Sequence, residues 1–166
     1  MSNFLLHNSG FDQLDLAILE ELQVNGRITV ADLARKIHLS QPAVYQRMKR
    51  LERAGIIKQY IALVNRETAG YDVLCFIRLT FQPHTTETWN QLEVLVQSLP
   101  AIMECYRTVG GSDVLLKVVV RTHRDLDRFI AESLSTLPGV ERIDTTLVLN
   151  ELKITTALPL KGRGSL

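Results

Sequence analysis

The sequence predicts an α+β protein with a helical N-terminal third and a sheet-containing remainder. Apolar residues recur at helical spacing up to about residue 55. Between residues 73 and 151 they instead form strand-like runs separated by two helical segments. Within this second part, Leu99-Pro100-Ala101-Ile102-Met103-Glu104 recurs as Leu137-Pro138-Gly139-Val140-Glu141-Arg142. The chain has 166 residues, of which 46% are hydrophobic, so it can hold one domain or two small ones.

The first helix is expected over about Gln13 to Val24. Asp12 is a good N-cap because its carboxylate can accept from the free N–H groups of the first turn. Asn25-Gly26 is expected to end the helix, since glycine tolerates a left-handed conformation. The apolar stripe consists of Leu14, Ile18, Leu19 and Leu22.

Two further helices follow closely and predict a helix-turn-helix. One begins after the N-cap Thr29 and runs to Ile37, and the turn is His38-Leu39-Ser40. Ser40 caps the next helix, which has Pro42 in its first turn and closes at Gly55. Apolar residues share one face of each helix, namely Val30, Leu33, Ala34 and Ile37 in one and Val44, Met48 and Leu51 in the other.

The polar face of the third helix predicts double-stranded DNA as a partner. In this motif the N-terminal part of the second motif helix meets base edges, and flanking cations hold phosphates. We therefore expect Gln41, Ala43, Tyr45 and Gln46 to lie near bases, and the N-cap Ser40 belongs to the same DNA-binding set. A phosphate-contacting group would comprise Arg47, Arg50 and Arg27, and Arg47 can also recognise guanine.

The charge pattern agrees with this interpretation. The net charge is only +1, but residues 40–58 carry five basic residues against Glu52. A local basic helix on a near-neutral protein is typical of a dedicated docking element. The alternative is a three-helix packing unit whose basic face is merely solvated, and the short fixed turn and the two capped helix starts argue against it.

A strand is expected over Ile56–Val64, leading out of the helical domain. Asn65 to Gly70 has the composition of a linker. The predicted organisation is a three-helix winged helix-turn-helix at 11–60, a strand and linker at 61–71 and a second domain at 72–160.

The second domain is expected to have the order βαββαβ. The strands cover Val73–Phe81, Ile102–Val109, Asp113–Val120 and about Val140–Glu151, and the helices cover about Thr86–Ser98 and Arg124–Thr136. This order and the internal repeat predict a ferredoxin-like fold, with two helices on one face of a four-stranded antiparallel sheet. The strands are apolar on both faces, so the uncovered face needs a partner, and the simplest partner is a second copy of the chain.

The loop Val109-Gly110-Gly111-Ser112-Asp113 is a candidate ligand site. Adjacent glycines expose backbone N–H groups for a carboxylate, and Asp113 can hold an ammonium group. A plain hairpin turn is the alternative, because Gly-Gly is a common turn pair.

Other classes of site are not indicated. Cys75 and Cys105 are expected to be small buried residues, and the four histidines (His7, His38, His84 and His123) lack metal-ligand spacing, so no metal or cofactor is predicted. No nucleophile–base pair or Walker-type phosphate loop is visible, so the protein is not expected to be an enzyme. Met1 to Gly10 has no features of a secretory signal and no apolar run is long enough for a membrane helix, which predicts a cytoplasmic protein.

The chain resembles the Lrp/AsnC family of regulators, also called feast/famine regulatory proteins. The resemblance extends from about Phe11 to Leu160, and its most specific stretch is Arg50 to Ile57. The matching segments are Leu14-Asp15-Leu16-Ala17-Ile18-Leu19, Asn25-Gly26-Arg27, Leu33-Ala34, Leu39-Ser40, Arg47 to Ile57, Gly110 to Leu116 and Leu137-Pro138-Gly139-Val140.

The resemblance implies a helix-turn-helix head and a ferredoxin-like tail that assembles into dimers and often octamers. It also implies an amino-acid effector bound between dimers. The effector site carried over from the family consists of Val109, Gly110, Gly111, Ser112, Asp113, Thr146, Leu147 and Val148. Many members have an aromatic residue where this chain has Ser112, which implies a more polar or wider pocket.

The sequence therefore predicts a ligand-responsive, sequence-specific transcription regulator. The second hypothesis is an architectural protein that wraps DNA with little sequence choice. Both use the same head, so only the ratio of specific to non-specific affinity separates them.

Overall fold

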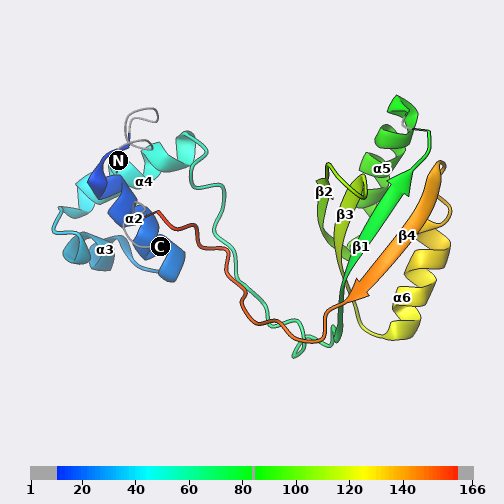
Figure 1. The fold of residues 1–166 in the computed structure, drawn as a ribbon. Coiled ribbons are helices and arrows are strands. Elements are labelled where there is room, and N and C mark those ends of the chain that lie inside the picture. The colour runs from blue at the N-terminus through cyan, green and yellow to red at the C-terminus, as the bar shows by residue number, and fades with distance from the viewer. Residues whose placement is uncertain (1–10, 84, 161–166) are drawn as a thin grey trace. The chain divides into compact units, whose positions relative to one another are not determined.

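The computed structural model describes residues 11–83 and 85–160, which form two compact units (Figure 1). One unit comprises the described parts of Met1–Leu63 and Lys153–Leu166, and the other is Val64–Leu152. No helix among the described residues is long and apolar enough to cross a membrane. The segment Met1 to Gly10, considered above for a signal sequence, lies outside the described residues.

The described part of the first unit contains three helices, as the hydrophobic spacing predicted: α2 (Gln13–Val24), α3 (Val30–Lys36) and α4 (Gln41–Arg53). The Asp12 carboxylate accepts from the backbone N–H groups of Leu14 and Asp15, and the Asp15 side chain accepts in return from the Asp12 N–H. Gly55 has φ +69° beyond the end of α4, a conformation that glycine adopts without strain. The buried core consists of Ile18, Leu33, Ala34, Val44 and Leu51.

The strand predicted over Ile56–Val64 does not form, so that expectation was wrong for the single chain. No strand is assigned between α4 and Val73, and Ile61, Leu63 and Val64 are exposed. A strand needs a neighbour to bond its backbone N–H and C=O groups, and no described segment pairs with this one.

The second unit has the predicted βαββαβ order. Its elements are β1 (Val73–Phe81), α5 (Thr86–Ser98), β2 (Ile102–Arg107), β3 (Val114–Val120), α6 (His123–Phe129), the π-helix η1 (Ile130–Leu134) and β4 (Val140–Leu147). The antiparallel sheet has the order β2-β3-β1-β4, and α5 and α6 cover the same face (Figure 1). This is the ferredoxin-like plan expected from the repeat.

Alternate residues of β1 and β3 build the core beneath the helices. Cys75, Ile77 and Leu79 of β1 are paired with Val118, Leu116 and Val114 of β3, and all six are buried. Leu92 of α5 and Phe129 of α6 close this core. The opposite face of the sheet mixes apolar with charged side chains, namely Phe76, Leu115, Val119 and Tyr106 with Arg78, Lys117, Glu104 and Asp144.

The last strand ends earlier than predicted, at Leu147 rather than about Glu151. Residues 153–160 group with the helical unit, although the sequence placed the end of the second domain at Leu160.

The side-chain amide of Gln23 in α2 binds this C-terminal segment. It accepts from the Leu158 N–H (2.6 Å) and donates to the Leu158 carbonyl (3.1 Å).

Candidate nucleic-acid interface and effector site

The turn between α3 and α4 has the geometry of a helix-turn-helix. Thr29 Oγ1 accepts from the Asp32 N–H (3.1 Å) and Ser40 Oγ from the Ala43 N–H (3.4 Å), so both helices start at the predicted caps. His38 adopts φ +57°, and the Leu39 N–H donates to the Ala34 carbonyl (3.0 Å), which reverses the chain. Ala34 is buried in the head core, as the close crossing of the helices requires.

The first half of α4 presents the predicted base-reading side chains to solvent. Gln41, Tyr45 and Gln46 are exposed, whereas Ala43 is only half-buried and Val44 faces the core. Gln41, Pro42 and Tyr45 line a shallow hollow together with Val30 of α3. This surface has the long polar side chains that base reading needs, and no described residue covers it.

The predicted phosphate-contacting arginines of α4 bind acids at the N-terminus of α2, namely its N-cap Asp12 and its residue Asp15. Arg47 Nη1 lies 2.6 Å from Asp12 Oδ2 and 2.9 Å from Asp15 Oδ1, and Arg50 also pairs with Asp15. Asp15 is completely buried, so this carboxylate depends on the two arginines and on the Asp12 N–H for compensation. The pKa of Arg47 is raised, first by its hydrogen bond to Asp12 and then by that to Asp15.

The two arginines differ in what they still offer to DNA. The side chain of Arg47 is 24% exposed, whereas that of Arg50 is 52% exposed. Arg47 therefore joins α4 to α2, and Arg50 keeps N–H groups available to a phosphate. The sequence missed Asp15 as a partner, although an acid three residues before the buried Ile18 of the apolar stripe was a visible signal.

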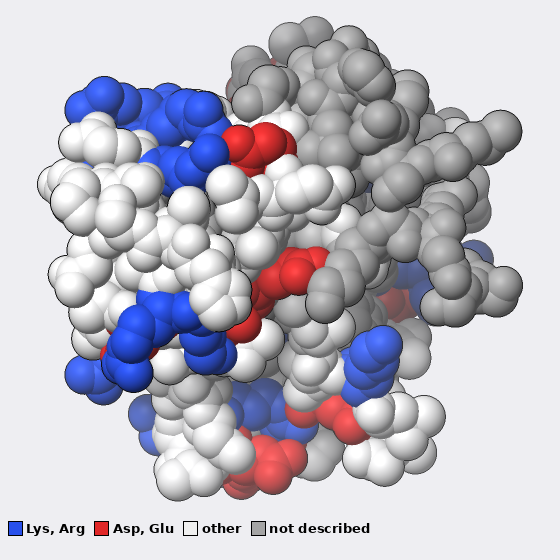
Figure 2. Space-filling model, turned by 90° about the vertical axis from the view of Figure 1, so that its left-hand side faces the viewer, with Lys and Arg blue, Asp and Glu red and all other residues white. Residues whose placement is uncertain are grey.

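A third acid, Glu52 of α4 itself, forms an ion pair in the second half of the helix. Lys49 Nζ lies 2.7 Å from Glu52 Oε2 and 5.7 Å from the Tyr45 ring centroid, and Tyr60 Oη donates to Glu52 Oε1 (3.2 Å). The pKa of Lys49 is raised by its hydrogen bond to Glu52. Figure 2 accordingly shows basic side chains in separate groups with acidic neighbours, rather than one continuous basic face.

Arg27 lies in the exposed segment before α3, where its N–H donates to Asn25 Oδ1 (3.0 Å). Its side chain lines a surface hollow with basic residues of α3, Arg35 and Lys36. This placement is compatible with a phosphate contact beside the motif.

The glycine loop connects β2 to β3. Gly110 adopts φ +136°, which favours glycine, and a Cβ at Gly111 would meet no atom within 4 Å. Asp113 Oδ2 accepts from the Phe81 N–H (2.8 Å), and the Asp113 N–H donates to the Leu79 carbonyl (3.0 Å). Asp113 thus also supports the end of β1, at a point where the pairing of β1 with β4 shifts register.

One chain does not bring the two parts of the predicted effector site together. The loop Val109–Asp113 lies beside the end of β1, whereas Thr146 pairs with Phe76 and the Val148 N–H donates to Leu74 near its start. Leu74 and Leu79 lie roughly 16 Å apart along an extended strand. A pocket that uses both groups therefore needs a second chain.

The two cysteines have different environments. Cys75 is buried in β1 as predicted, but Cys105 is exposed because β2 is an edge strand, so the expectation of two buried cysteines was wrong for Cys105. Burial raises the pKa of the Cys75 thiol to about 11. Among the described residues no group of three or more His, Cys, Asp or Glu side chains can hold a metal; His7 and His84 lie outside them.

Comparisons with known proteins agree with both halves of this arrangement. A winged helix-turn-helix DNA-binding family matches residues 11–58, and the Lrp/AsnC ligand binding domain matches residues 74–158. The leucine-responsive regulatory protein of Haemophilus influenzae is 35% identical over 154 residues, covering 93% of each chain. That of Escherichia coli K12 is 35% identical over 92% of this chain and 93% of its own.

Solved structures show the same architecture. A transcriptional regulator of Neisseria meningitidis in complex with L-Met has a TM-score of 0.87 at 32% identity, over 90% of this chain and 97% of its own. Escherichia coli AsnC has a TM-score of 0.81 at 28% identity, over 89% and 97%. These relatives are regulators rather than enzymes. On this agreement of sequence, fold and helix-turn-helix geometry, the chain belongs to the Lrp/AsnC family of transcription regulators.

Proposed function

We propose that this regulator binds specific DNA sequences in the cytoplasm as a dimer or larger oligomer, and that an amino acid or related small molecule modulates its binding. The observation that carries the DNA-reading part is the exposed face of α4, where Gln41, Tyr45 and Gln46 project from the first two turns of the second motif helix. Glutamine can bond the N6 and N7 edge of adenine in the major groove, so this face can distinguish base pairs.

The test compares affinities for the DNA upstream of the protein's own gene and for random duplex of equal length, by fluorescence anisotropy at physiological salt. Replacing Gln46 with alanine is expected to lower the specific affinity roughly tenfold, because one base contact contributes about 1–3 kcal/mol of discrimination. Affinity for random duplex should change little. Gln13→Ala, an exposed glutamine at the start of α2, is the matched control.

The architectural alternative predicts a different result. A protein that only wraps DNA would bind the upstream sequence no better than random duplex, and Gln46→Ala would leave the ratio near one. That outcome would replace sequence-specific regulation with DNA compaction as the proposed role.

Assembly into dimers is supported by apolar surface that the single chain leaves uncovered. The outer face of the sheet carries Phe76, Leu115 and Val119, and Leu63, Leu149 and Leu152 are exposed in segments outside the helices and strands. Burying such side chains on a second copy is favourable, and a two-fold dimer would present two α4 helices to two half-sites. A family octamer would add contacts between such dimers.

The effector proposal rests on the glycine loop. The matching family domain is a ligand-binding one, and the Neisseria relative is a complex with L-Met. In this chain Ser112 leaves the loop without an aromatic side chain, and Thr146 to Val148 would come from a neighbouring chain. The backbone N–H groups of Gly110 and Gly111 would bind the carboxylate and Asp113 the ammonium group.

Asp113→Asn is the sharper test of this effector site, because the asparagine oxygen can still accept from the Phe81 N–H while the charge is lost. A screen of amino acids by thermal shift should find a stabilising ligand for the natural protein, since a ligand that binds only the native state raises its stability. The variant should lose that shift and retain DNA binding without effector. An undiminished shift in Asp113→Asn would contradict the role of Asp113.

A further inference from the structure

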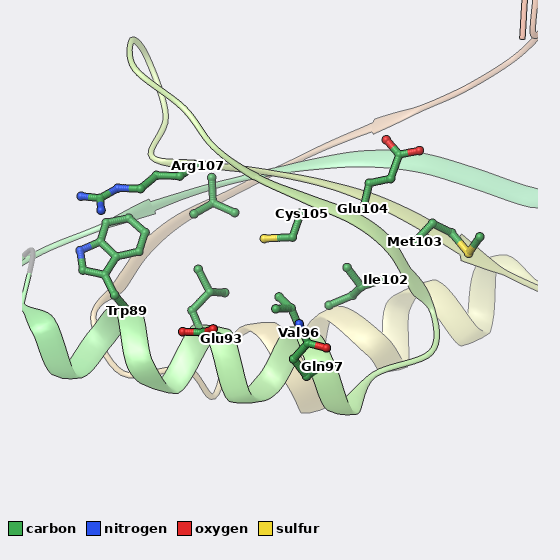
Figure 3. Close-up of a pocket in the computed structure, with 11 residues that line it drawn as sticks. Trp89, Glu93, Val96, Gln97, Ile102, Met103, Glu104, Cys105 and Arg107 are labelled. Carbon is green, nitrogen blue, oxygen red and sulfur yellow. The ribbon is translucent and has the colours of Figure 1, made fainter. Parts of the chain in front are cut away.

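A cavity of about 470 Å³ lies between α5 and the edge strand β2, away from the residues assigned to the effector (Figure 3). One chain supplies all of its lining residues, whereas the proposed effector residues of the glycine loop and of Thr146 to Val148 are far apart within one chain. Its volume is within the range of small-molecule sites in proteins, roughly 300–1,000 Å³.

The inner part of this cavity is apolar. Leu92 and Val114 are buried at its base, and Val96 of α5 and Ile102 of β2 are partly buried beside them. The Cys105 thiol is directed toward the Trp89 end of the space (Figure 3). An aliphatic group placed here would leave water for an apolar surrounding.

The end of the cavity near Trp89 carries two opposite charges. The Arg107 guanidinium lies 4.1 Å from the Trp89 ring centroid, and Glu93 follows Trp89 by four residues, hence on the same side of α5. Figure 3 shows both charged groups at this end of the cavity. Within residues 11–83 and 85–160, neither Arg107 nor Glu93 forms an ion pair.

The other charged lining residue is already engaged. Glu104 lies 3.0 Å from Lys117 Nζ and accepts from Tyr106 Oη (2.7 Å). The two charges of the lining that lack an ion-pair partner are therefore a guanidinium and a carboxylate. The guanidinium can bind a carboxylate through two parallel N–H groups, and the carboxylate can accept from an ammonium group.

We propose that this cavity binds an α-amino acid with an aliphatic side chain. Arg107 holds its carboxylate, Glu93 its ammonium group, and Leu92, Val96 and Ile102 surround its side chain. A simple carboxylic acid fits less well because Glu93 would repel it. The cavity does not include the glycine loop, and all of its lining residues come from one chain. The proposal for the cavity therefore stands or falls independently of the proposed effector site at the glycine loop.

The chain offers a direct probe, because Trp89 is its single tryptophan. The full-length protein is titrated with L-leucine, L-methionine and L-valine while Trp89 fluorescence is followed, and calorimetry gives the affinity. At least one amino acid should perturb the fluorescence. Compared with L-leucine, 4-methylpentanoate and 3-methylbutylamine, each lacking one charge, are expected to bind at least tenfold more weakly.

Variants then assign the charges. Arg107→Gln should lower the affinity for the amino acid at least tenfold, as measured by calorimetry. Glu93→Gln should lower the affinity for L-leucine but not that for 4-methylpentanoate. Arg128→Gln, an exposed arginine of α6, is the matched control. The unfolding temperature of each free variant shows that the fold is retained.

Three outcomes would overturn this site. In the first, none of the three amino acids changes Trp89 fluorescence. In the second, calorimetric binding persists unchanged in both Arg107→Gln and Glu93→Gln. In the third, Asp113→Asn loses amino-acid binding while Arg107→Gln retains it, which would keep the glycine-loop effector site and reject the cavity.

Discussion

Arg47 and Arg50 occupy adjacent positions on the same ion-pair network but differ in exposure. Both reach the buried Asp15, and Arg47 also reaches Asp12. A count of charges along the sequence does not distinguish the two arginines. The packing of α2 against α4 does: it leaves the Arg47 side chain mostly covered and the Arg50 side chain half-exposed.

Arg47→Ala is expected to destabilise the helical unit by about 2 kcal/mol. Breaking a buried ion pair typically costs about 3–5 kcal/mol, and here Arg50 would still compensate Asp15. The slope of log affinity against log salt should fall by less than one, whereas Arg50→Ala should lower it by about one. Denaturation and DNA titrations at several salt concentrations measure both effects; a full unit lost in Arg47→Ala with unchanged stability would contradict the structural role.

Asp12 makes the stability of the same unit dependent on pH. Burial opposes ionisation, but the hydrogen bonds from the Asp15 N–H and Arg47 outweigh it and hold the pKa of Asp12 below its ordinary value of 3.8. A carboxylate with a lowered folded-state pKa contributes stability above the unfolded pKa, and this is lost as pH falls through the folded pKa.

Asp12→Asn should therefore be less stable than the natural protein at pH 7, and the difference should shrink below about pH 3.8. Asparagine remains a good N-cap, so the comparison isolates the charge. Thermal unfolding of the helical unit at pH 7 and pH 3 is the measurement. A difference that is constant with pH would assign the effect to something other than the titration of Asp12.

At the scale of single elements, the N-caps of the three helices of the helical unit were the most predictable feature. Thr29, Ser40 and Asp12 cap where the sequence placed them, because capping depends on side chains next to the backbone they bind. The second helix of the C-terminal domain differs: it begins one residue earlier than predicted and becomes a π-helix over Ile130–Leu134. A hydrophobic pattern does not distinguish these two helical forms over a single turn.

Gly139, at the turn into β4, provides a prediction at this scale. It adopts φ +80°, and an added Cβ would lie 3.5 Å from Thr88 Oγ1 and 3.6 Å from the Gln82 carbonyl. Gly139→Ala should destabilise the sheet domain by about 1–2 kcal/mol, the cost of a left-handed alanine. Gly111→Ala is the matched control, since a Cβ there meets nothing. Equal unfolding temperatures for the two variants would contradict this account.

For the whole molecule, the outer face of the sheet determines the expected assembly. Leu115→Asp places a carboxylate on that face, between its cross-strand neighbours Arg78 of β1 and Tyr106 of β2. If two copies pack there, the variant should sediment as a monomer at concentrations where the natural protein is a dimer, because burying a carboxylate is costly even beside an arginine. Val94→Asp, on an exposed position of α5, should leave the mass unchanged. A dimeric Leu115→Asp protein would place the interface elsewhere.

The sequence by itself determined the two-part organisation, the helix-turn-helix and the βαββαβ order, because hydrophobic period, caps and turns are local signals. It also identified the polar face of α4. The tertiary structure decided which charges remain free: Asp15 comes from another helix, and its pairing with Arg47 and Arg50 cannot be seen along one segment. The order and register of the strands decide which distant residues become neighbours. They place the glycine loop far from Thr146 within one chain, and they form the cavity between α5 and β2.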